Sequence, residues 1–492
     1  MIPLTKRSFS LLSSSLLLAG CSLAPHYEAP TVSIPAAYKE AAVDSSASQD
    51  WKTAQPADDQ QRGEWWTVFN DPTLNALEQQ AIAGNQTLKA AAANLQASRA
   101  LRQAAQSQWF PKVSAGFGPT RQKPSPASQG LDADAHTSTR TLWRAQADVS
   151  YEIDLFGRIS NSVNAAGAGV QQQEALFQSA LLALQADVAE GYFLIRQLDA
   201  EHALYTRTVQ LLGQTRDLMQ KRFNHGDISE LDLARSQSEL SAAEAEALGI
   251  ARSRADAEHA LATLLGKTPA EFSLETSPLP EMSVSIPAGL PSSLLERRPD
   301  IAAAERAMAA ENARIGIARA AYFPNLSLTG ALGYESSSLG TLTQWSSRTF
   351  LLGPLAGTLL SLPIFDGGQR KAGVAQARAA YEESVANYRQ TVLNAFREVE
   401  NGLSDQRIIS QQIQVQAQAV SSAKRANQIS HLRYKEGAIS YLDVIDADRS
   451  VLLQEQQAVQ LNGDRTRSAV RLIRALGGGW QVQQQQAGLA IK

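Results

Sequence analysis

The residues that could do chemistry at a catalytic or metal site are few and scattered in this sequence. It holds one cysteine, and its six histidines form neither an HExxH motif nor a close pair, so metal ligands would have to come from distant segments. Gly266, Lys267 and Thr268 match the end of a phosphate-binding loop, but Leu261 stands where that loop needs its first glycine. No GxSxG or dinucleotide glycine pattern occurs. We therefore expect a protein that is not an enzyme and uses no metal or other cofactor.

The one cysteine follows an N-terminal segment that is typical of a secretory signal. Lys6 and Arg7 precede an apolar stretch that is too short to span a bilayer, which predicts a signal peptide over residues 1–20. The signal ends in Leu-Ala-Gly before Cys21, and this sequence resembles the lipobox of bacterial lipoproteins, in which the cysteine carries lipid. An ordinary signal peptide with an incidental thiol is the alternative. We expect an exported protein with lipid attached to Cys21.

Composition excludes nucleic acid as a partner and points to long helices. The 492 residues include 48 acidic and 45 basic ones, for a net charge of -3, whereas binding to phosphate backbones needs a basic surface. Prolines are absent from residues 127–268 and 364–492, and proline breaks helix interiors. Residues 21–63 contain several prolines and no apolar period, so they are predicted to form an extended, lipidated tether.

An internal repeat divides the rest of the chain into two copies of one unit. Residues 222–233 (RFNHGDISELDL) recur as residues 433–444 (RYKEGAISYLDV). Three more pairs of landmarks follow the same order, namely 109–111 with 322–324, 153–157 with 362–366, and 265–266 with 476–477. The repeat predicts one unit at 64–284 with a tip turn at 224–230, a second at 285–480 with a tip turn at 435–441, and a C-terminal tail at 481–492.

Within each unit the expected order is short helix, two strands, long helix, tight turn and short return helix. The helical elements are a first helix over 72–109, long helices over 161–223 and 369–433, turns at Gly226 and Gly437, and return helices ending at Leu265 and Leu476. At 1.5 Å per residue each long helix would measure about 95 Å. Two short helices end to end would match one long helix, which predicts long, laterally packed rods.

The expected strands have one apolar and one polar face. They lie at 112–118, 142–154, 326–335 and 351–363, separated by exposed loops at 119–140 and 335–350. Their period of two suits a transmembrane β-barrel with a wet lumen, although a half-buried soluble sheet gives the same pattern. No apolar stretch of 18 residues exists after the signal, so a membrane crossing would need strands. Four strands cannot close a barrel, and three copies of the chain would supply twelve around a lumen.

These features together resemble the TolC-like outer-membrane efflux family, in particular its lipoprotein branch. The motifs that carry the resemblance are the lipobox, the segment 65–72 (WWTVFNDP), the two Phe-Pro strand starts, the segments 155–158 (LFGR) and 363–368 (PIFDGG), and the paired Gly-x-Ile-Ser-x-Leu-Asp turns. The resemblance implies an α+β membrane protein whose homotrimer forms a twelve-stranded transmembrane β-barrel continued by a long α-helical barrel, the periplasmic tunnel. It also implies the outer membrane of a Gram-negative bacterium as the location.

The resemblance further implies a function and a gate. The channel would be a passive exit duct for drugs or other toxic solutes, working with a periplasmic adaptor and an inner-membrane pump, commonly of the resistance-nodulation-division type. Asp443 and Asp446 match the acidic positions of the family's periplasmic gate, and Asp232 is the counterpart of Asp443 in repeat one. Their spacing of three puts Asp443 and Asp446 on one helix face, so a trimer would present six carboxylates. Where the family often has a basic residue, this chain has Ile439.

Three alternatives compete with this reading. In the first alternative, the aspartates serve only as caps of the helices that begin near Ser440. In the second, the duct serves type I protein secretion instead of solute efflux, although the resemblance associates the lipobox with the efflux branch. A periplasmic coiled-coil adaptor or structural lipoprotein would explain the rods but not the strands, and it would be soluble after Cys21→Ser, whereas a membrane channel would still need detergent.

Overall fold

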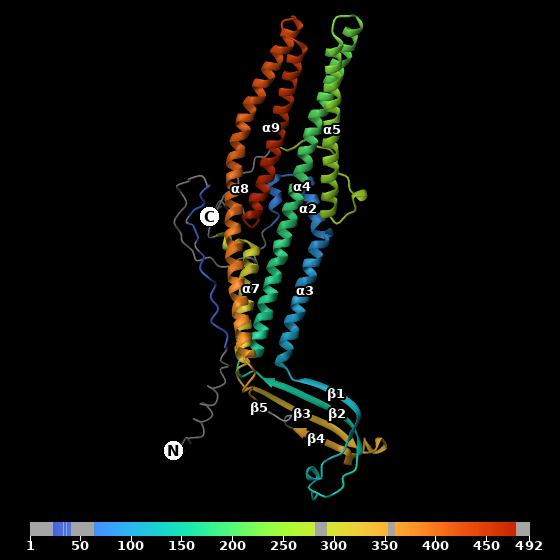
Figure 1. The fold of residues 1–492 in the computed structure, drawn as a ribbon, viewed down its shortest axis with the longest axis vertical. Coiled ribbons are helices and arrows are strands. Elements are labelled where there is room, and N and C mark those ends of the chain that lie inside the picture. Colours follow the sequence, from blue (N-terminus) through green and yellow to red (C-terminus); the bar gives the residue numbers. More distant parts are fainter. Residues whose placement is uncertain are drawn as a thin grey trace, which may run out of the picture. The chain divides into compact units, whose positions relative to one another are not determined.

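The computed structural model describes residues 23–32, 34–35, 37–40, 63–280, 293–352 and 360–478. The expected signal peptide, Cys21 and the C-terminal tail lie outside these residues. The chain divides into two compact units. We name them the sheet unit, built mainly from Leu95–Gln173 and Ala304–Tyr388, and the hairpin unit, built mainly from Glu174–Ala303 and Arg389 onward. Figure 1 shows the order of elements, which occurs twice along the chain.

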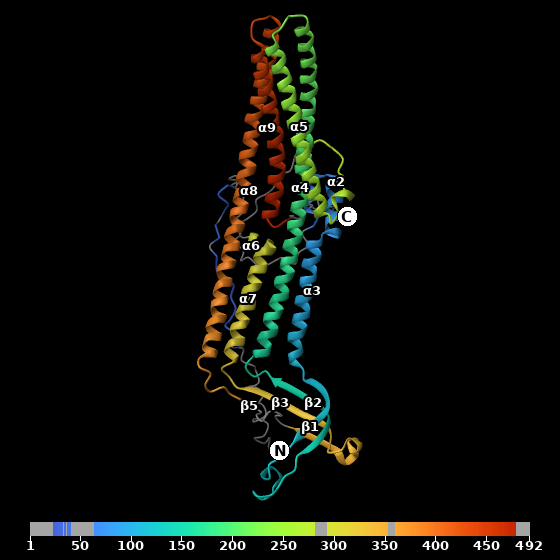
Figure 2. The same cartoon turned by 45° about the vertical axis from the view of Figure 1, so that its right-hand side comes forward.

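The predicted long helices are confirmed. The helices of repeat one are α2 Pro72–Gly84, α3 Gln86–Gln106, α4 Arg158–Asn224 and α5 Glu230–Leu264, and those of repeat two are α6 Ser293–Arg297, α7 Pro299–Ala320, α8 Gln369–Lys435 and α9 Tyr441–Ala475. α4 and α8 have 67 residues each, which corresponds to about 100 Å. In the hairpin unit, α4 lies beside α5 and α8 beside α9 (Figure 2). No helix in the described part of the chain is both long enough and apolar enough to cross a membrane.

The single helix predicted over 72–109 is wrong, because the chain breaks at Asn85. The Asn85 backbone is extended, and its side chain accepts a hydrogen bond from the Leu88 amide (2.8 Å), which caps α3. The same side chain donates to the Leu264 carbonyl at the end of α5 (2.9 Å). In repeat two, Arg298 lies between α6 and α7 and donates to the Ala475 carbonyl at the end of α9 (3.0 Å). Both repeats therefore use a polar side chain at the break to hold the end of the return helix.

Two glycines let the backbones of α2 and the end of α5 approach each other at this joint. A Cβ atom added at Gly84 would lie 2.2 Å from the Leu265 carbonyl oxygen, and one added at Gly266 would lie 2.3 Å from the Gly84 oxygen. We therefore expect Gly84→Ala to lower the free energy of unfolding by about 1–3 kcal/mol. Gly213→Ala is the matched control, because a Cβ there meets nothing within 4 Å. Equal denaturant midpoints for the two variants would contradict the close approach.

The strands form one antiparallel sheet in the order β1-β2-β3-β4, with β5 also paired to β3. They are β1 Lys112–Gln122, β2 Arg140–Ile153, β3 Asn325–Ser336, β4 Arg348–Leu352 and β5 Leu360–Ser361. The first three predicted strands are confirmed, with β1 four residues longer than expected. The fourth was predicted to start at residue 351, but it starts at Arg348, because the backbone there already pairs with Tyr334. Residues 353–359, between β4 and β5, lie outside the described residues.

The register gives the sheet one apolar and one polar face, as the alternation predicted. Val113 pairs with Val149, and Ala147 pairs with Leu332, which in turn pairs with Phe350. Large side chains on this apolar face are exposed in the single chain, with 69% exposure for Val113 and Leu332 and 79% for Phe350. On the opposite face the paired Arg144 and Glu335 side chains form an ion pair at 2.5 Å. An apolar face this open needs a covering partner.

The segment before α2 is fixed onto α4 by an aromatic core. Trp65 and Trp66 are buried in the largest apolar cluster of the hairpin unit, together with Phe193 of α4. The Trp65 indole donates to the Gln185 side-chain oxygen (3.0 Å), and the Tyr192 hydroxyl donates to Asp71 (2.6 Å). Because buried indole and phenol groups need hydrogen-bond partners, these two bonds account for the polar groups that Gln185 and Asp71 supply to the aromatic core.

Candidate gate at the hairpin tips

The two tip turns share one backbone conformation. Gly226 and Gly437 have φ angles of 81° and 71°, which glycine adopts at little cost. In the first turn the Gly226 amide donates to the Phe223 carbonyl (2.9 Å) and the next amide donates to the Arg222 carbonyl (2.9 Å). In the second turn the Gly437 amide donates to the Tyr434 carbonyl (3.0 Å), and the Ala438 amide donates to the Arg433 carbonyl (2.9 Å). This pattern is the Schellman ending of a helix.

Asp443 and Asp232 lie at the third position of the return helices and take part in their caps. The Asp443 carboxylate accepts hydrogen bonds from the Ser440 amide (2.9 Å) and hydroxyl (2.8 Å), which completes a capping box. These bonds hold the pKa of the Asp443 carboxyl below its usual range. Asp232 accepts a bond from the Ser229 hydroxyl (3.0 Å) and lies 3.8 Å from Arg235. The cap alternative thus describes a real contact of Asp443, but it leaves the carboxylate exposed.

Asp446 lies one turn further along α9 and has a different environment. Asp443 and Asp446 are both exposed, whereas Tyr441, Val444 and Ile445 between and beside them are buried. The two carboxylates therefore share the exposed face of the first turns of α9, as their spacing predicted. Within the described residues no hydrogen bond or ion pair joins Asp446 to another side chain. Its counterpart in repeat one is Arg235, so the pair of acids on one helix face occurs in repeat two and not in repeat one.

Ile439 belongs to an apolar cluster beneath the tips. The cluster contains buried residues of α4 and α9 with partly buried residues of both turns and the adjoining helices, namely Met219, Tyr441, Val444 and Ile445 with Ile228, Leu233, Tyr434 and Ile439. Burial is the main cause that raises the pKa of Tyr441 to about 12, so this phenol is neutral at physiological pH. A basic side chain at position 439 would offer the tip an ionic contact, whereas Ile439 makes apolar contacts in this cluster.

Polar contacts that the sequence did not reveal join the hairpin of repeat one to that of repeat two. The Arg222 guanidinium donates to the Tyr434 hydroxyl (3.2 Å). Further along the hairpins, Arg449 Nε of α9 lies 2.8 Å from the Glu239 carboxylate of α5. Within the second hairpin, His431 and Asp448 are 2.9 Å apart. Partners more than 200 residues apart leave no signal in a local pattern.

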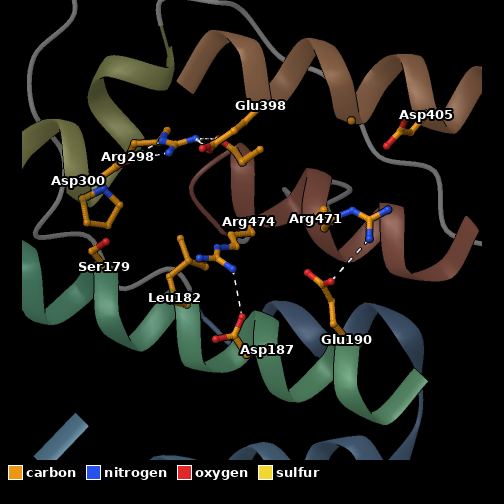
Figure 3. A pocket seen from close by; sticks show the side chains of 14 residues that line it. Ser179, Leu182, Asp187, Glu190, Arg298, Asp300, Glu398, Asp405, Arg471 and Arg474 are labelled. Carbon is orange, nitrogen blue, oxygen red and sulfur yellow. Dashed lines mark hydrogen bonds and ion pairs between the residues drawn. The ribbon is translucent and has the colours of Figure 1, made fainter. Parts of the chain in front are cut away.

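A charged cavity lies farther down the hairpin unit, where repeat one meets repeat two. Figure 3 shows α4 and α9 joined across it by ion pairs, from Arg474 to Asp187 (3.1 Å) and from Arg471 to Glu190 (3.7 Å). The cavity measures about 540 Å³. Burial raises the pKa of Glu190, and the neighbouring arginine opposes that rise. No group of three or more His, Cys, Asp or Glu side chains in the described ranges is placed to hold a metal ion.

Comparisons with known proteins agree with this geometry. The outer membrane efflux protein family matches residues 77–267 and 290–478, once in each repeat. The antibiotic efflux pump outer membrane protein ArpC of Pseudomonas putida is 32% identical over 98% of both chains. The cation efflux system protein CusC of Escherichia coli is 32% identical over 95% of this chain and 97% of its own. The solved structure of the outer-membrane channel OprN covers 94% of this chain and 100% of its own with 31% identity and a TM-score of 0.82.

The fold and the comparisons agree on what kind of protein this is. The long helices with a modest antiparallel sheet correspond to the helical tunnel and β domain of the TolC-like outer-membrane channels. The family consists of channel proteins and not of enzymes. The chain therefore belongs to the outer membrane efflux protein family, and it is an outer-membrane channel subunit of an efflux system.

Proposed function

We propose that three copies of this chain form a passive exit duct that works with a periplasmic adaptor and an inner-membrane pump of the resistance-nodulation-division type. The observation that carries the proposal is the sheet, whose apolar face is exposed and whose edge strands β1 and β4 have no further partner strand among the described residues. Open edges are unfavourable in lipid. Three copies would join these edges into a closed twelve-stranded barrel with the polar face, including Arg144 and Glu335, toward the lumen.

The exported solute is proposed only as a class, namely drugs or other toxic solutes. Relatives of nearly equal similarity are named for antibiotics in one case and for cations in another. Because a wide duct makes few contacts with its cargo, choice of solute would rest with the pump. The duct itself would need no cofactor and would catalyse no reaction.

We also propose an organisation of the chain around this duct. Residues 1–20 would be removed, Cys21 would carry lipid, and residues 21–63 would form the tether. Repeat one would extend over 64–284 and repeat two over 285–480, followed by the tail 481–492, and both family matches fall inside these repeats. The tip turns at Gly226 and Gly437 would form the periplasmic end, with Asp443, Asp446 and Asp232 as its acidic residues.

The gate proposal predicts that the channel prefers cations because of Asp446. Six exposed carboxylates around a narrow opening attract cations and repel anions. We expect Asp446→Asn to lower the cation-to-anion permeability ratio of the purified trimer, measured as the reversal potential across a planar bilayer with a salt gradient. Asp446 is the sharper site, because Asp443 is also part of a cap and its replacement would change the helix start.

A matched control separates the effect of the six Asp443 and Asp446 carboxylates, the proposed ring, from the effect of any exposed acid near the tips. Asp227 is an exposed acid in the tip turn of repeat one and lies outside the proposed ring. Asp227→Asn should leave the reversal potential near that of the wild type. A protein that conducts no ions at all would overturn the duct, whereas a conducting trimer whose selectivity ignores Asp446 would overturn only the gate assignment.

A further inference from the structure

The N-terminal segment that follows Cys21 is bound to α7 within the sheet unit through polar contacts of three of its residues. The Arg319 guanidinium donates to the Leu23 carbonyl (3.1 Å), and the Asn312 amide donates to the Pro25 carbonyl (2.9 Å). The Tyr27 hydroxyl donates to the Glu305 carboxylate (2.6 Å). Every second residue of the segment therefore has a partner on one helix.

The partners on α7 form a regular row. Glu305, Asn312 and Arg319 are spaced by seven residues, and two helical turns bring such residues back to nearly the same face. The segment runs in the opposite direction to α7, since its earliest described residue meets the latest partner. Repetition at a fixed spacing is what a built groove shows and a chance surface contact does not.

Packing between the polar contacts supports the groove. A Cβ atom added at Gly316 would lie 2.8 Å from the Ala24 Cβ and 2.6 Å from the Asn161 side-chain nitrogen of α4. Only glycine therefore lets the segment and α4 come this close to α7. We call this face of α7, formed by Glu305, Asn312, Gly316 and Arg319, the α7 groove.

The α7 groove is largely desolvated. Glu305 and Asn312 are only 8% and 6% exposed. Glu305 also pairs with the neighbouring Arg306, so its charge is compensated. Burial is the main cause that raises the pKa of Tyr27, with the Glu305 contact adding to it, so the Tyr27 hydroxyl stays protonated and able to donate. Buried polar contacts of this kind are costly to leave unmade.

We propose that the α7 groove fixes where the mature N-terminus leaves the protein, so that lipid on Cys21 stays close to the sheet and cannot move away at the end of a long unbound segment. This proposal rests on the proposed lipidation. Leu23 is two residues from Cys21, which limits the separation to about 7 Å. Arg319 lies in the last turn of α7, shortly before β3 begins at Asn325.

The start of β3 has side chains suited to a membrane interface. Tyr322 and Phe323 are 44% and 39% exposed, and Trp109 and Phe110, the corresponding pair before β1, are 43% and 67% exposed. Aromatic residues at the ends of membrane strands favour the headgroup region. The groove would thus deliver the acyl chains to the leaflet that meets this end of the sheet.

Without the groove the anchor would have much more freedom. The next described hydrogen bonds from the segment to another element are in the hairpin unit, where the Lys39 and Glu40 amides donate to the Glu400 carboxylate (2.8 and 3.0 Å). Eighteen residues separate Cys21 from Lys39, a reach of about 60 Å when extended. Loss of the groove contacts would therefore increase the greatest possible distance between Cys21 and its first bound residue roughly eightfold.

Chymotrypsin tests the groove, because it cleaves after Tyr27 only when the segment is released. We expect the double variant Asn312→Ala with Arg319→Ala, reconstituted in liposomes, to be cleaved there about tenfold faster or more than the wild type. Tyr27→Phe keeps the cleavage site and leaves α7 untouched, and it should give a smaller increase. Arg314→Ala is the matched control, because Arg314 pairs with Glu311 of the same helix and is outside the groove.

Two further measurements separate the groove from the lipid. Cys21→Ser should be cleaved as slowly as the wild type, because the groove and not the lipid holds the segment. Equal rates for the wild type and the double variant, or rapid cleavage of Cys21→Ser, would overturn the groove. The mass of the released wild-type peptide reports lipidation independently, so an unmodified Cys21 would refute the anchor while the cleavage rates still decide the groove.

Discussion

Replacing Asp199 by alanine should destabilise the hairpin unit by about 3–5 kcal/mol, because it removes the counter-ion of the buried Arg196 and leaves the partly buried Arg254 with Glu258 alone. Asp199 is 8% exposed, and it lies 2.9 Å from Arg196 Nη1 and 2.6 Å from Arg254 Nε. The same arginines donate to the Glu275 and Leu274 carbonyls, both at 2.6 Å. The network therefore ties α4 and α5 to the segment that leads from repeat one toward repeat two.

The expected loss can be assigned to the buried charge with two comparisons. Asp199→Asn keeps the size of the side chain and one acceptor, so its unfolding free energy should fall less than that of the alanine variant. Asp217→Ala removes an exposed acid from the same helix and should change the unfolding free energy by no more than about 0.5 kcal/mol. Denaturant unfolding at one fixed protein concentration would measure all three, and similar losses for Asp199→Ala and Asp217→Ala would contradict the network.

The helices and the first three strands could be predicted because their signals are local. Proline-free tracts and apolar periodicity predicted α4 and α8 to within a few residues of their observed ends. Strict alternation predicted β2 and the two faces of the sheet, and the register later placed Val149 and Leu332 on one face. Such one-dimensional patterns need no knowledge of which segments meet.

The breaks between elements could not be predicted in this way. Asn85 interrupts an apolar period that continues on both sides of it, and the reason for the break is its bond to the end of α5, 179 residues away. The fourth strand was misplaced for a similar reason, since Arg348 joins the sheet through pairing with Tyr334. Tertiary partners decided both cases.

The features of the candidate gate also differ in whether a local sequence pattern could predict them. The turns at Gly226 and Gly437 could be predicted because the repeat and the turn chemistry mark them in the sequence, whereas Asp443 was named from the family resemblance and its role in a gate stays a prediction. The contact of Arg222 with Tyr434 and that of Arg449 with Glu239 could not be predicted, because each joins separate hairpins. The α7 groove was missed because a proline-rich tether has no period of its own, and only its partners on α7 are regularly spaced.

A second large effect is expected at Glu78, where replacement should stabilise the protein. Glu78 is 0% exposed between the buried Leu77 and Ala81 of α2, and neither carboxylate oxygen has a hydrogen-bond partner among the described residues. Burial raises the pKa of Glu78 to about 9, so the folded chain holds it protonated at pH 7. Because an unfolded glutamate would ionise, we expect Glu78→Leu to raise the unfolding free energy at pH 7 by about 3 kcal/mol.

The same residue should make stability depend on pH, with a definite sign. Between the unfolded pKa of 4.5 and the folded value of about 9, the folded state retains a proton that the unfolded state has lost. The Glu78 contribution is therefore fully present below pH 4.5 and declines as the pH rises, by about 1.4 kcal/mol for each pH unit in this window. Above the folded pKa the carboxylate would be charged in an apolar site, which is the least favourable condition for α2 to stay packed.

Glu78→Gln isolates the proton from the packing, because glutamine has nearly the same shape and does not titrate. Its unfolding midpoint, followed by tryptophan fluorescence from pH 5 to pH 9 at constant protein concentration, should decline less steeply than that of the wild type, since every other titrating group is shared. The buried Trp65 and Trp66 belong to the apolar cluster that includes the neighbouring Leu77, so the signal reports on this region. Parallel decline of the two proteins would mean that Glu78 is ionised or paired in the folded chain, and the expected gain in Glu78→Leu would then disappear as well.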